Sequence, residues 1–207
     1  MSVTSQHKLA ENRPFDREAQ YNAKRRAVIR SAAAAFRRRG YHNASMTEIA
    51  KSLGLTKAAL YYYVKSKEEI LFEAHIMVYD KMDELVKAVR GQGDTGLEKL
   101  QLLYGEFAHM LTRDGLALLT DIDSLNGENQ ETVLKRRGKI ERAVTRLVEK
   151  GMADDSIKKA DAKVTVFFLM GALNWLNVWY EAGGRISGDD IAQQFVAQMS
   201  VGVANPT

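Results

Sequence analysis

Residues 45–64 read SMTEIAKSLGLTKAALYYYV, and this stretch decides the fold of the first third of the chain. Ser45 and Glu48 have the spacing of a capping box. In that motif the serine side chain accepts a hydrogen bond from the amide of the third helical residue, and the glutamate carboxylate reaches back. A short helix near 46–53 is therefore predicted.

A second short helix follows directly. Gly54 readily takes a positive φ in a tight turn, and Thr56 can then cap a helix near 57–64. Two short helices joined by a glycine-containing turn predict a helix-turn-helix. An ordinary helical hairpin is the alternative interpretation of this pattern.

The formal net charge of the 207 residues is +4, and it is unevenly distributed. Residues 1–70 hold 14 lysines and arginines against 6 acidic residues, whereas residues 71–207 hold 16 against 20. A basic first third predicts contact with a polyanion. The absence of cysteine excludes disulfides and thiolate zinc sites. The polar N-terminus has no signal-peptide pattern, so we expect a cytoplasmic protein.

The rest of the chain has helical patterns, and its two prolines, Pro14 and Pro206, lie near the ends. No convincing run of alternating β-branched residues occurs, so an all-α fold is predicted. A second capping box, Ser66 with Glu69, is expected to open the longest helix of the first half. The helices are expected near 22–39, 46–53, 57–64, 67–90, 97–113, 115–125, 129–151, 160–182 and 188–202.

Residues 27–71, AVIRSAAAAFRRRGYHNASMTEIAKSLGLTKAALYYYVKSKEEIL, resemble the TetR-type one-component transcriptional repressors. The resemblance is carried by the Ala-rich helix ending in Phe and then Gly-Tyr, by Ser/Thr-x-x-x-Ile-Ala, by Gly-Leu-Thr-Lys, by Leu-Tyr and by Ser-Lys-Glu. It implies a three-helix DNA-binding domain at 22–82 and a helical ligand-binding and dimerisation domain at 83–207. It also implies a dimeric repressor that binds an inverted-repeat operator and responds to a small effector.

On this resemblance the second helix of the motif is the recognition helix, whose first residues meet base edges in the major groove. Lys57 is the candidate for a guanine contact and Ala58 for a thymine methyl. Three adjacent tyrosines follow, and because neighbouring residues point about 100° apart they cannot share one face. Contact with DNA phosphates is expected for them, while packing remains the alternative for one of the three. The predicted DNA-contacting residues are Ser45, Thr47, Thr56, Lys57, Ala58, Tyr61, Tyr62, Tyr63 and Lys67.

Residues 1–21 are expected to form a flexible basic arm that carries Lys8, Arg13 and Arg17. Such arms enter the DNA minor groove in some proteins, and solvated disorder is the other interpretation.

Residues 164–180, VTVFFLMGALNWLNVWY, are uncharged throughout. A membrane span needs ~20 apolar residues, and Asn174 and Asn177 interrupt this stretch, so no membrane contact is expected. A helix that is apolar all round is buried on several sides. The resemblance implies that the last two helices form the dimer interface. Trp175 and Trp179 share one helix face and are open to two readings: core or interface, or the wall of a ligand cavity.

The effector is expected in a cavity bounded by the 67–90 helix, the 97–113 helix and the two tryptophans. The segment Asn-Trp-Leu-x-x-Trp-Tyr at 174–180 is similar to regulators that sense acyl-CoA thioesters, which implies a small apolar effector of that class. The basic cluster KRRGKIERAVTR at 135–146 fits either a CoA phosphate or a solvated helix face. The candidate ligand-binding residues are Tyr104, Phe107, Met110, Phe168, Trp175 and Trp179.

Enzyme motifs are lacking: the sequence has no Walker loop, dinucleotide fingerprint, zincin helix or nucleophile elbow. The four histidines are not spaced as metal ligands on one helix. We therefore expect no catalytic site, no metal and no cofactor. The alternative function is a helical enzyme, or a ligand-binding protein without sequence-specific DNA binding. The complete caps and the basic recognition helix favour a regulator whose partners are double-stranded DNA, a second copy of the chain and a small effector.

Overall fold

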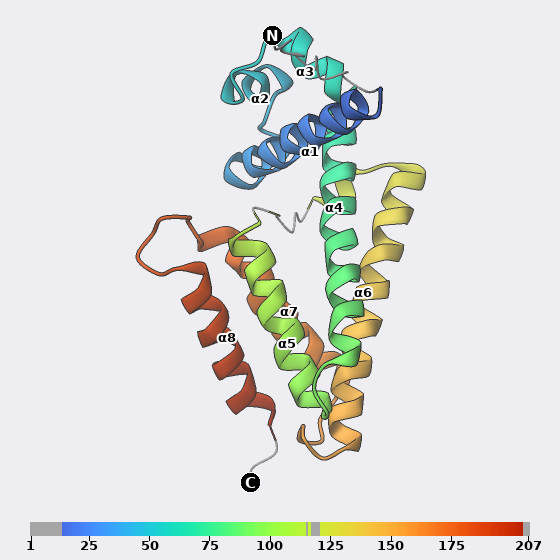
Figure 1. Cartoon of the computed structure of the whole chain (residues 1–207), viewed down its shortest axis with the longest axis vertical. Coiled ribbons are helices and arrows are strands. Elements are labelled where there is room, and N and C mark those ends of the chain that lie inside the picture. Colours follow the sequence, from blue (N-terminus) through green and yellow to red (C-terminus); the bar gives the residue numbers. More distant parts are fainter. Residues whose placement is uncertain (1–13, 115, 117–120, 205–207) are drawn as a thin grey trace, which may run out of the picture.

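The computed structural model describes residues 14–114, 116 and 121–204, and its regular elements are all helices (Figure 1). The prediction of an all-α fold is confirmed. The elements are α1 (Pro14–Arg39), α2 (Met46–Ser52), α3 (Lys57–Tyr63), α4 (Lys67–Ala88), the 3-10 turn η1 (Val89–Gly91), α5 (Gly96–Thr112), the 3-10 turn η2 (Ile122–Ser124), α6 (Gly127–Ala153), α7 (Ala162–Trp179) and α8 (Gly188–Val203).

Two predicted boundaries need correction. Helix α1 begins at Pro14, so residues 14–21 are helical and do not belong to a flexible arm. Proline is common in the first turn of a helix because its φ is already helical. An N–H group at that position would have no acceptor within the helix, so its absence in proline costs no hydrogen bond. Residues 1–13, which include Lys8 and Arg13 of the predicted arm, lie outside the described residues. The helix expected at 115–125 is a 3-10 turn at Ile122–Ser124 in its described part, and residues 115 and 117–120 lie outside that part.

The long helix α4 joins the two halves of the molecule (Figure 1). Its first turns pack against α1 beside the helix-turn-helix, and its later turns pack against α5 and α6. The helix is continuous across the domain boundary predicted at 82/83. A tilt of α4 is therefore shared by both halves.

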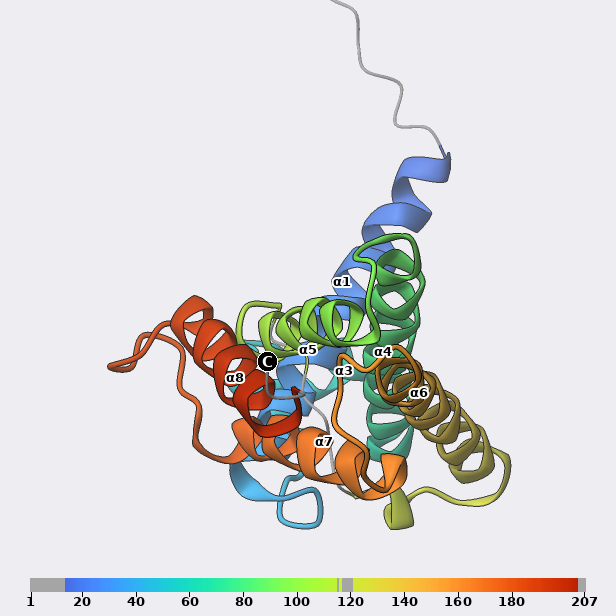
Figure 2. The ribbon, with the colours of Figure 1, turned by 90° about the horizontal axis from the view of Figure 1, so that it is seen from below.

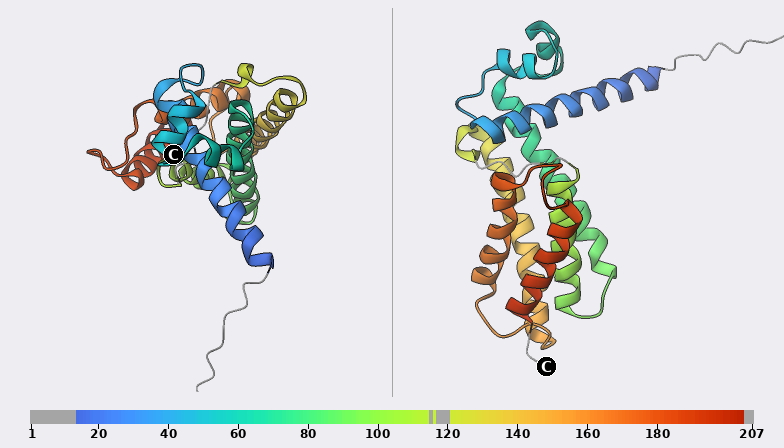
Figure 3. Two further views of the ribbon diagram at one scale, coloured as in Figure 1. Left: turned by 90° about the horizontal axis from the view of Figure 1, so that it is seen from above. Right: turned by 90° about the vertical axis from the view of Figure 1, so that its left-hand side faces the viewer.

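Helix α5 is central to the C-terminal half, because it packs against α4, α6, α7 and α8. Seen end-on, α8 and α6 lie on opposite sides, with α5 and α7 between them (Figure 2). The side view shows α1 projecting well beyond the helix-turn-helix (Figure 3). Among the described residues, no helix combines the length and the apolarity needed to cross a bilayer.

Candidate nucleic-acid interface and effector cavity

The caps of the two short helices form as predicted. The Ser45 hydroxyl accepts from the Glu48 amide at 3.2 Å, and Glu48 Oε2 accepts from the Ser45 amide at 3.1 Å. The backbone hydrogen bond from Ser45 is the main reason that the pKa of Glu48 is lowered. Gly54 has φ +65° in the turn, and Thr56 Oγ1 accepts from the Ala59 amide at 3.1 Å. The predicted helix-turn-helix is confirmed.

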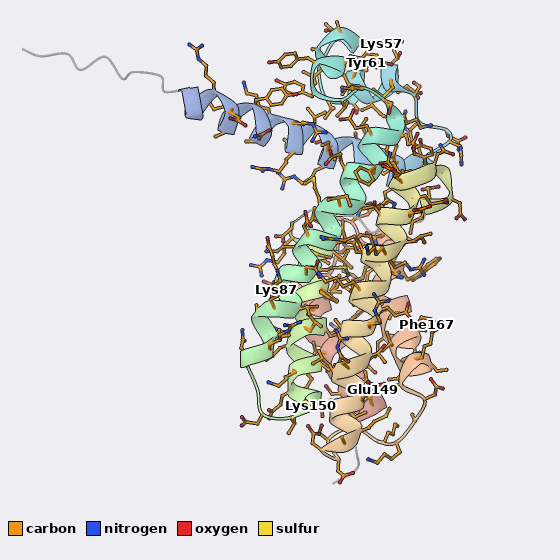
Figure 4. All side chains as sticks on the ribbon, turned by 90° about the vertical axis from the view of Figure 1, so that its right-hand side faces the viewer. Lys57, Tyr61, Lys87, Glu149, Lys150 and Phe167 are labelled. Carbon is orange, nitrogen blue, oxygen red and sulfur yellow. The ribbon has the colours of Figure 1, made fainter. Side chains whose placement is uncertain are left out.

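Helix α3 has a buried side and an exposed side. Leu60 is fully buried, and Val64 directly after the helix is 1% exposed. The opposite side carries Lys57 and Ala58, both exposed, with Tyr61 44% exposed and Tyr62 67% exposed. Lys57 Nζ lies 5.9 Å from the centre of the Tyr61 ring, and both residues lie at the outer end of the molecule (Figure 4).

Tyr63 is the tyrosine that packs. Its ring stacks on Tyr21 of α1 with 5.6 Å between centroids, and it meets Tyr62 edge-on at 5.0 Å. The Tyr21 hydroxyl donates to the Tyr62 carbonyl at 3.2 Å. Because these contacts hold the end of α3 against α1, the orientation of the recognition helix depends on α1.

Arg25 of α1 adds a charged clamp to this contact. Its Nε donates to the Tyr63 carbonyl at 3.1 Å, and its Nη2 pairs with Glu73 at 2.9 Å and with Glu69 at 2.7 Å. The hydrogen bond to Glu73 is the largest cause of the raised pKa of Arg25. Sequence reasoning missed Tyr21 because the helix was expected to start at residue 22, and it did not separate Arg25 from the neighbouring cations Lys24 and Arg26. The spacing of four between Tyr21 and Arg25 was the available signal.

Lys67 is the first residue of α4, as expected, and its ammonium contacts other groups of the protein. Its ammonium donates to the His42 carbonyl at 3.2 Å and lies 4.3 Å from the centre of the Tyr41 ring, and burial lowers its pKa. The second capping box is half wrong: Ser66 Oγ accepts from the Glu69 amide, but the Glu69 carboxylate accepts from the Lys65 amide instead of reaching Ser66.

Among the other predicted DNA contacts, Ser45, Thr47 and Thr56 are exposed. Their contacts with DNA stay predictions, as do those of α3 and of Lys67. Of the two lysines in this set, Lys67 is less available to a phosphate than Lys57, because its ammonium already contacts the His42 carbonyl and the Tyr41 ring.

A cavity of about 310 Å³ lies between α4, α6 and α7. Burial raises the pKa of the Tyr79 phenol, against the opposing effect of the Arg137 charge, so Tyr79 presents a protonated hydroxyl at neutral pH. Phe167, at the surface beside the cavity, is labelled in Figure 4. The lining consists of Tyr79, Met82, Arg137, Ile140, Glu141, Val166, Phe167, Met170, Gly171 and Asn174.

This cavity differs from the predicted one. Tyr104, Phe107 and Met110 of α5 are buried in the core, because α5 is covered on several sides. The Tyr104 hydroxyl donates to the Leu169 carbonyl at 3.0 Å, and burial raises its pKa to about 12. None of these three residues lines the cavity between α4, α6 and α7, and their contact with an effector stays a prediction.

The other three predicted ligand residues lie on the surface of the single chain. Phe168 is 69% exposed, Trp175 62% and Trp179 42%. They belong to a broad apolar surface on α7 and α8, which we call the α7–α8 face. Its large exposed members are Val164, Phe167, Phe168, Trp175, Val178, Trp179 and Val201.

The basic cluster at 135–146 is divided by the structure. Arg136 pairs with Asp80 and, at 3.4 Å, with Asp83, and Lys139 pairs with Asp83 at 2.8 Å. These pairs join α6 to α4. Arg137 instead lies at the cavity, with its charge near Tyr79. Sequence reasoning did not separate Arg137 from its neighbours, because all of them read as one basic helix face.

The start of α6 also contacts the DNA-binding half directly. The Asn126 amide donates to Glu68 Oε1 at 3.0 Å. Ser124 Oγ and His42 Nε2 lie 3.1 Å apart within hydrogen-bonding distance. The helix that lines the cavity is thus linked to the start of α4 and to the loop between α1 and α2.

No group of three or more His, Cys, Asp and Glu side chains in the described ranges is arranged to hold a metal ion.

Comparison with known proteins identifies both halves of the chain. Residues 28–74 match the model "Bacterial regulatory proteins, tetR family", and residues 93–203 match "Tetracyclin repressor-like, C-terminal domain". The HTH-type transcriptional repressor KstR2 of Mycolicibacterium smegmatis is 25% identical over 202 residues, which cover 91% of this chain and 94% of that protein. These relatives are transcriptional regulators and not enzymes.

Two solved structures are similar over most of their length. AibR in complex with isovaleryl coenzyme A and operator DNA has a TM-score of 0.70 and 26% identity, covering 84% of this chain and 96% of that one. KstR2 of Mycobacterium tuberculosis has a TM-score of 0.79 over 89% of this chain and 97% of that one, and at 19% identity it shows the fold alone. The C-terminal model covers more than half of the chain, and the helix-turn-helix that it follows has the expected caps and turn. This protein belongs to the TetR family of bacterial transcriptional regulators.

Proposed function

We propose that the protein is a dimeric, cytoplasmic repressor that binds an inverted-repeat operator through α3 and leaves it when an acyl-CoA thioester binds. The observation that carries this proposal is the two-sided recognition helix. Leu60 and Val64 anchor one side in the core, while Lys57, Ala58, Tyr61 and Tyr62 are exposed on the other side. Lys57 and Tyr61 lie at the end of the molecule (Figure 4).

The chemistry of the outward side fits a DNA groove. Lys57 is a hydrogen-bond donor for the guanine edge, and Ala58 is small enough to contact a thymine methyl. Tyr61 and Tyr62 carry hydroxyls that are able to donate to phosphate oxygens. The exposed hydroxyls of Ser45 and Thr47 at the start of α2 are further phosphate contacts in this proposal.

The α7–α8 face supports the dimer. Monomeric soluble proteins rarely expose a contiguous apolar patch of several large side chains, so such a patch indicates a covered surface. A twofold dimer buries the same face of both protomers, and this symmetry requires an operator with two inverted half-sites. In this proposal Phe168, Trp175 and Trp179 belong to the interface and not to the effector cavity.

The cavity between α4, α6 and α7 supports an amphipathic effector. Its volume of about 310 Å³ lies at the lower end of the ~300–1,000 Å³ typical of ligand sites. Met82, Ile140 and Met170 offer apolar contacts for a short acyl chain. Arg137 supplies a cation for a phosphate or carboxylate, and the Tyr79 hydroxyl is a donor for a thioester carbonyl. Isovaleryl coenzyme A is bound by the similar protein AibR, so a short-chain acyl-CoA is the class that we propose here.

The DNA proposal is tested by footprinting the purified protein on the region upstream of its own gene. We expect protection of an inverted repeat. Lys57→Ala should weaken operator binding by about 1–3 kcal/mol and relax base preference at one position per half-site. The absence of any protected repeat there or in a genomic selection, or equal losses on operator and random duplexes, would contradict the assigned base contact.

The effector proposal is tested by titrating isovaleryl-CoA, free coenzyme A and isovalerate into the protein–operator complex. We expect the thioester to release the DNA more effectively than either half. Arg137→Gln should weaken thioester binding about tenfold or more, because a charge-assisted hydrogen bond contributes ~1.5–3 kcal/mol, and should leave operator binding in the absence of thioester unchanged.

Arg146→Gln is the matched control, since residue 146 is exposed and lies 180° around α6 from residue 137 at 100° per residue. Equal weakening by the two variants would mean that net charge, and not the cavity, holds the effector.

A further inference from the structure

We propose that the first turns of α1 form a second DNA contact, in which Arg17 and Lys24 bind backbone phosphates flanking the operator. This inference rests on the proposed function, because it requires α3 to lie in the major groove. It concerns a surface that the helix-turn-helix does not include. Residues 17–24 belong to a helix and not to a loose arm, so their side chains have fixed directions.

The directions follow from the helical period of about 100° per residue. Taking Arg17 as zero, Tyr21 lies at about 40° and Arg25 at about 80°. Both of these residues contact the end of α3: Tyr21 through Tyr62 and Tyr63, and Arg25 through the Tyr63 carbonyl. The α3 side of α1 is thereby located.

The α4 side of the same helix lies further round. Ile29 and Ala33, at about 120° and 160° from Arg17, line one small cavity together with Ala74 and Val78 of α4. Going around α1, the order is therefore α4, then α3, then the positions of Arg17 and of Lys24 at about −20°. The two cations lie beyond α3, on the side away from α4.

That side is also the side of the DNA-facing rings. Tyr21 lies edge-on to the Tyr62 ring at 5.4 Å, and Tyr62 is the most exposed aromatic of α3. Arg17 is one helical turn beyond Tyr21, which is about 6 Å at a rise of 1.5 Å per residue. Arg17 therefore lies on the part of α1 that projects beyond the helix-turn-helix (Figure 3). A duplex bound by α3 would continue past the recognition helix on this side.

Both cations are available for such a contact. Arg17 and Lys24 are exposed, and neither forms an ion pair with another of the described residues. Arg25, by contrast, is held by two carboxylates. An exposed, unpaired cation gains affinity by displacing counterions from DNA, and this gain is independent of sequence. The partner is therefore the phosphate backbone outside the half-site and not a base.

The test compares Arg17→Ala with Arg26→Ala, which removes the same charge from an exposed position on the same helix but 180° away. Operator affinity is measured from 50 to 200 mM salt on two duplexes. One duplex ends at the edge of the repeat, and the other carries flanking base pairs. Circular dichroism confirms that the variants are folded.

On the long duplex we expect Arg17→Ala to lose two phosphate contacts per dimer. The log–log salt slope should fall in magnitude by about 1.8, at ~0.9 per contact. Over a fourfold change in salt this slope difference corresponds to about a 12-fold difference in relative affinity. On the short duplex Arg17→Ala and the unchanged protein should have the same slope, and Arg26→Ala should keep the slope on both duplexes.

An unchanged slope for Arg17→Ala on the long duplex would overturn the inference, and so would an equal change for Arg26→Ala. Both results would leave operator binding by α3 intact. Failure of the unchanged protein to bind either duplex would instead overturn the proposed function, and this inference with it.

Discussion

Replacing Trp175 by alanine tests the α7–α8 face most directly. Trp175 is 62% exposed in the single chain, which is ~150 Å² of a side chain of ~250 Å². Two copies in a dimer therefore offer ~300 Å², or ~7 kcal/mol at 25 cal/mol per Å² if they are buried completely. Alanine still buries part of this area, and side chains at the rim of an interface remain partly hydrated. We therefore expect the substitution to remove about half of this free energy. Trp175→Ala should thus weaken the dimer by ~3–4 kcal/mol, or ~100-fold to 1,000-fold in Kd.

The assay is analytical ultracentrifugation over a range of protein concentrations. Leu134→Ala on α6 is the matched control, because Leu134 is also an exposed large apolar side chain, at 47%, but lies outside the α7–α8 face. Substitutions at exposed positions usually change the stability of the fold by less than about 0.5 kcal/mol. Once the contribution of dimerisation is subtracted, both variants should therefore have the same unfolding free energy as the unchanged protein. A dimer constant that Trp175→Ala leaves unaltered would refute the assignment of this face as the interface.

Three further predictions concern the DNA-binding half and its junction with α4. Ser45→Ala should cost ~1 kcal/mol of unfolding free energy by removing the cap of α2, whereas Ser45→Gly should cost only a few tenths; equal losses in urea titrations would contradict the cap. Arg25→Met should cost ~1–2 kcal/mol, because it removes bonds to two carboxylates and a carbonyl that are only partly exposed. It should also weaken operator binding, and an unaltered operator affinity would show that the clamp does not orient α3. Burial lowers the pKa of His75 to about 4, so the unfolded chain binds a proton that the folded chain excludes as pH falls from about 6.5 to 4. Unfolding free energy should therefore fall by ~2 kcal/mol between pH 7 and pH 5, and His75→Leu should remove most of that loss; an equal pH dependence in both proteins would assign it to other groups.

The parts of the fold and of the site that could be predicted are those that depend on interactions between residues close together in the sequence. The Ser45 box, the Gly54 turn and the Thr56 cap involve residues within four positions of one another, so the sequence pattern specifies them. The start of α1 was missed because it lacks such a local pattern. Residues 14–21 have a weak pattern of their own, and the ring of Tyr21 rests on tyrosines about forty positions away.

What the sequence by itself determined is the helix-turn-helix, its outward basic face and the all-α class. Only the tertiary structure decided that Tyr63 is the ring that packs, that Lys67 is held by the protein, and that Trp175 and Trp179 are on the surface. The apolar pattern of a helix such as α7 indicates that several of its sides are covered, but it does not indicate what covers each side. That information lies in contacts between distant segments, and local periodicity does not encode it.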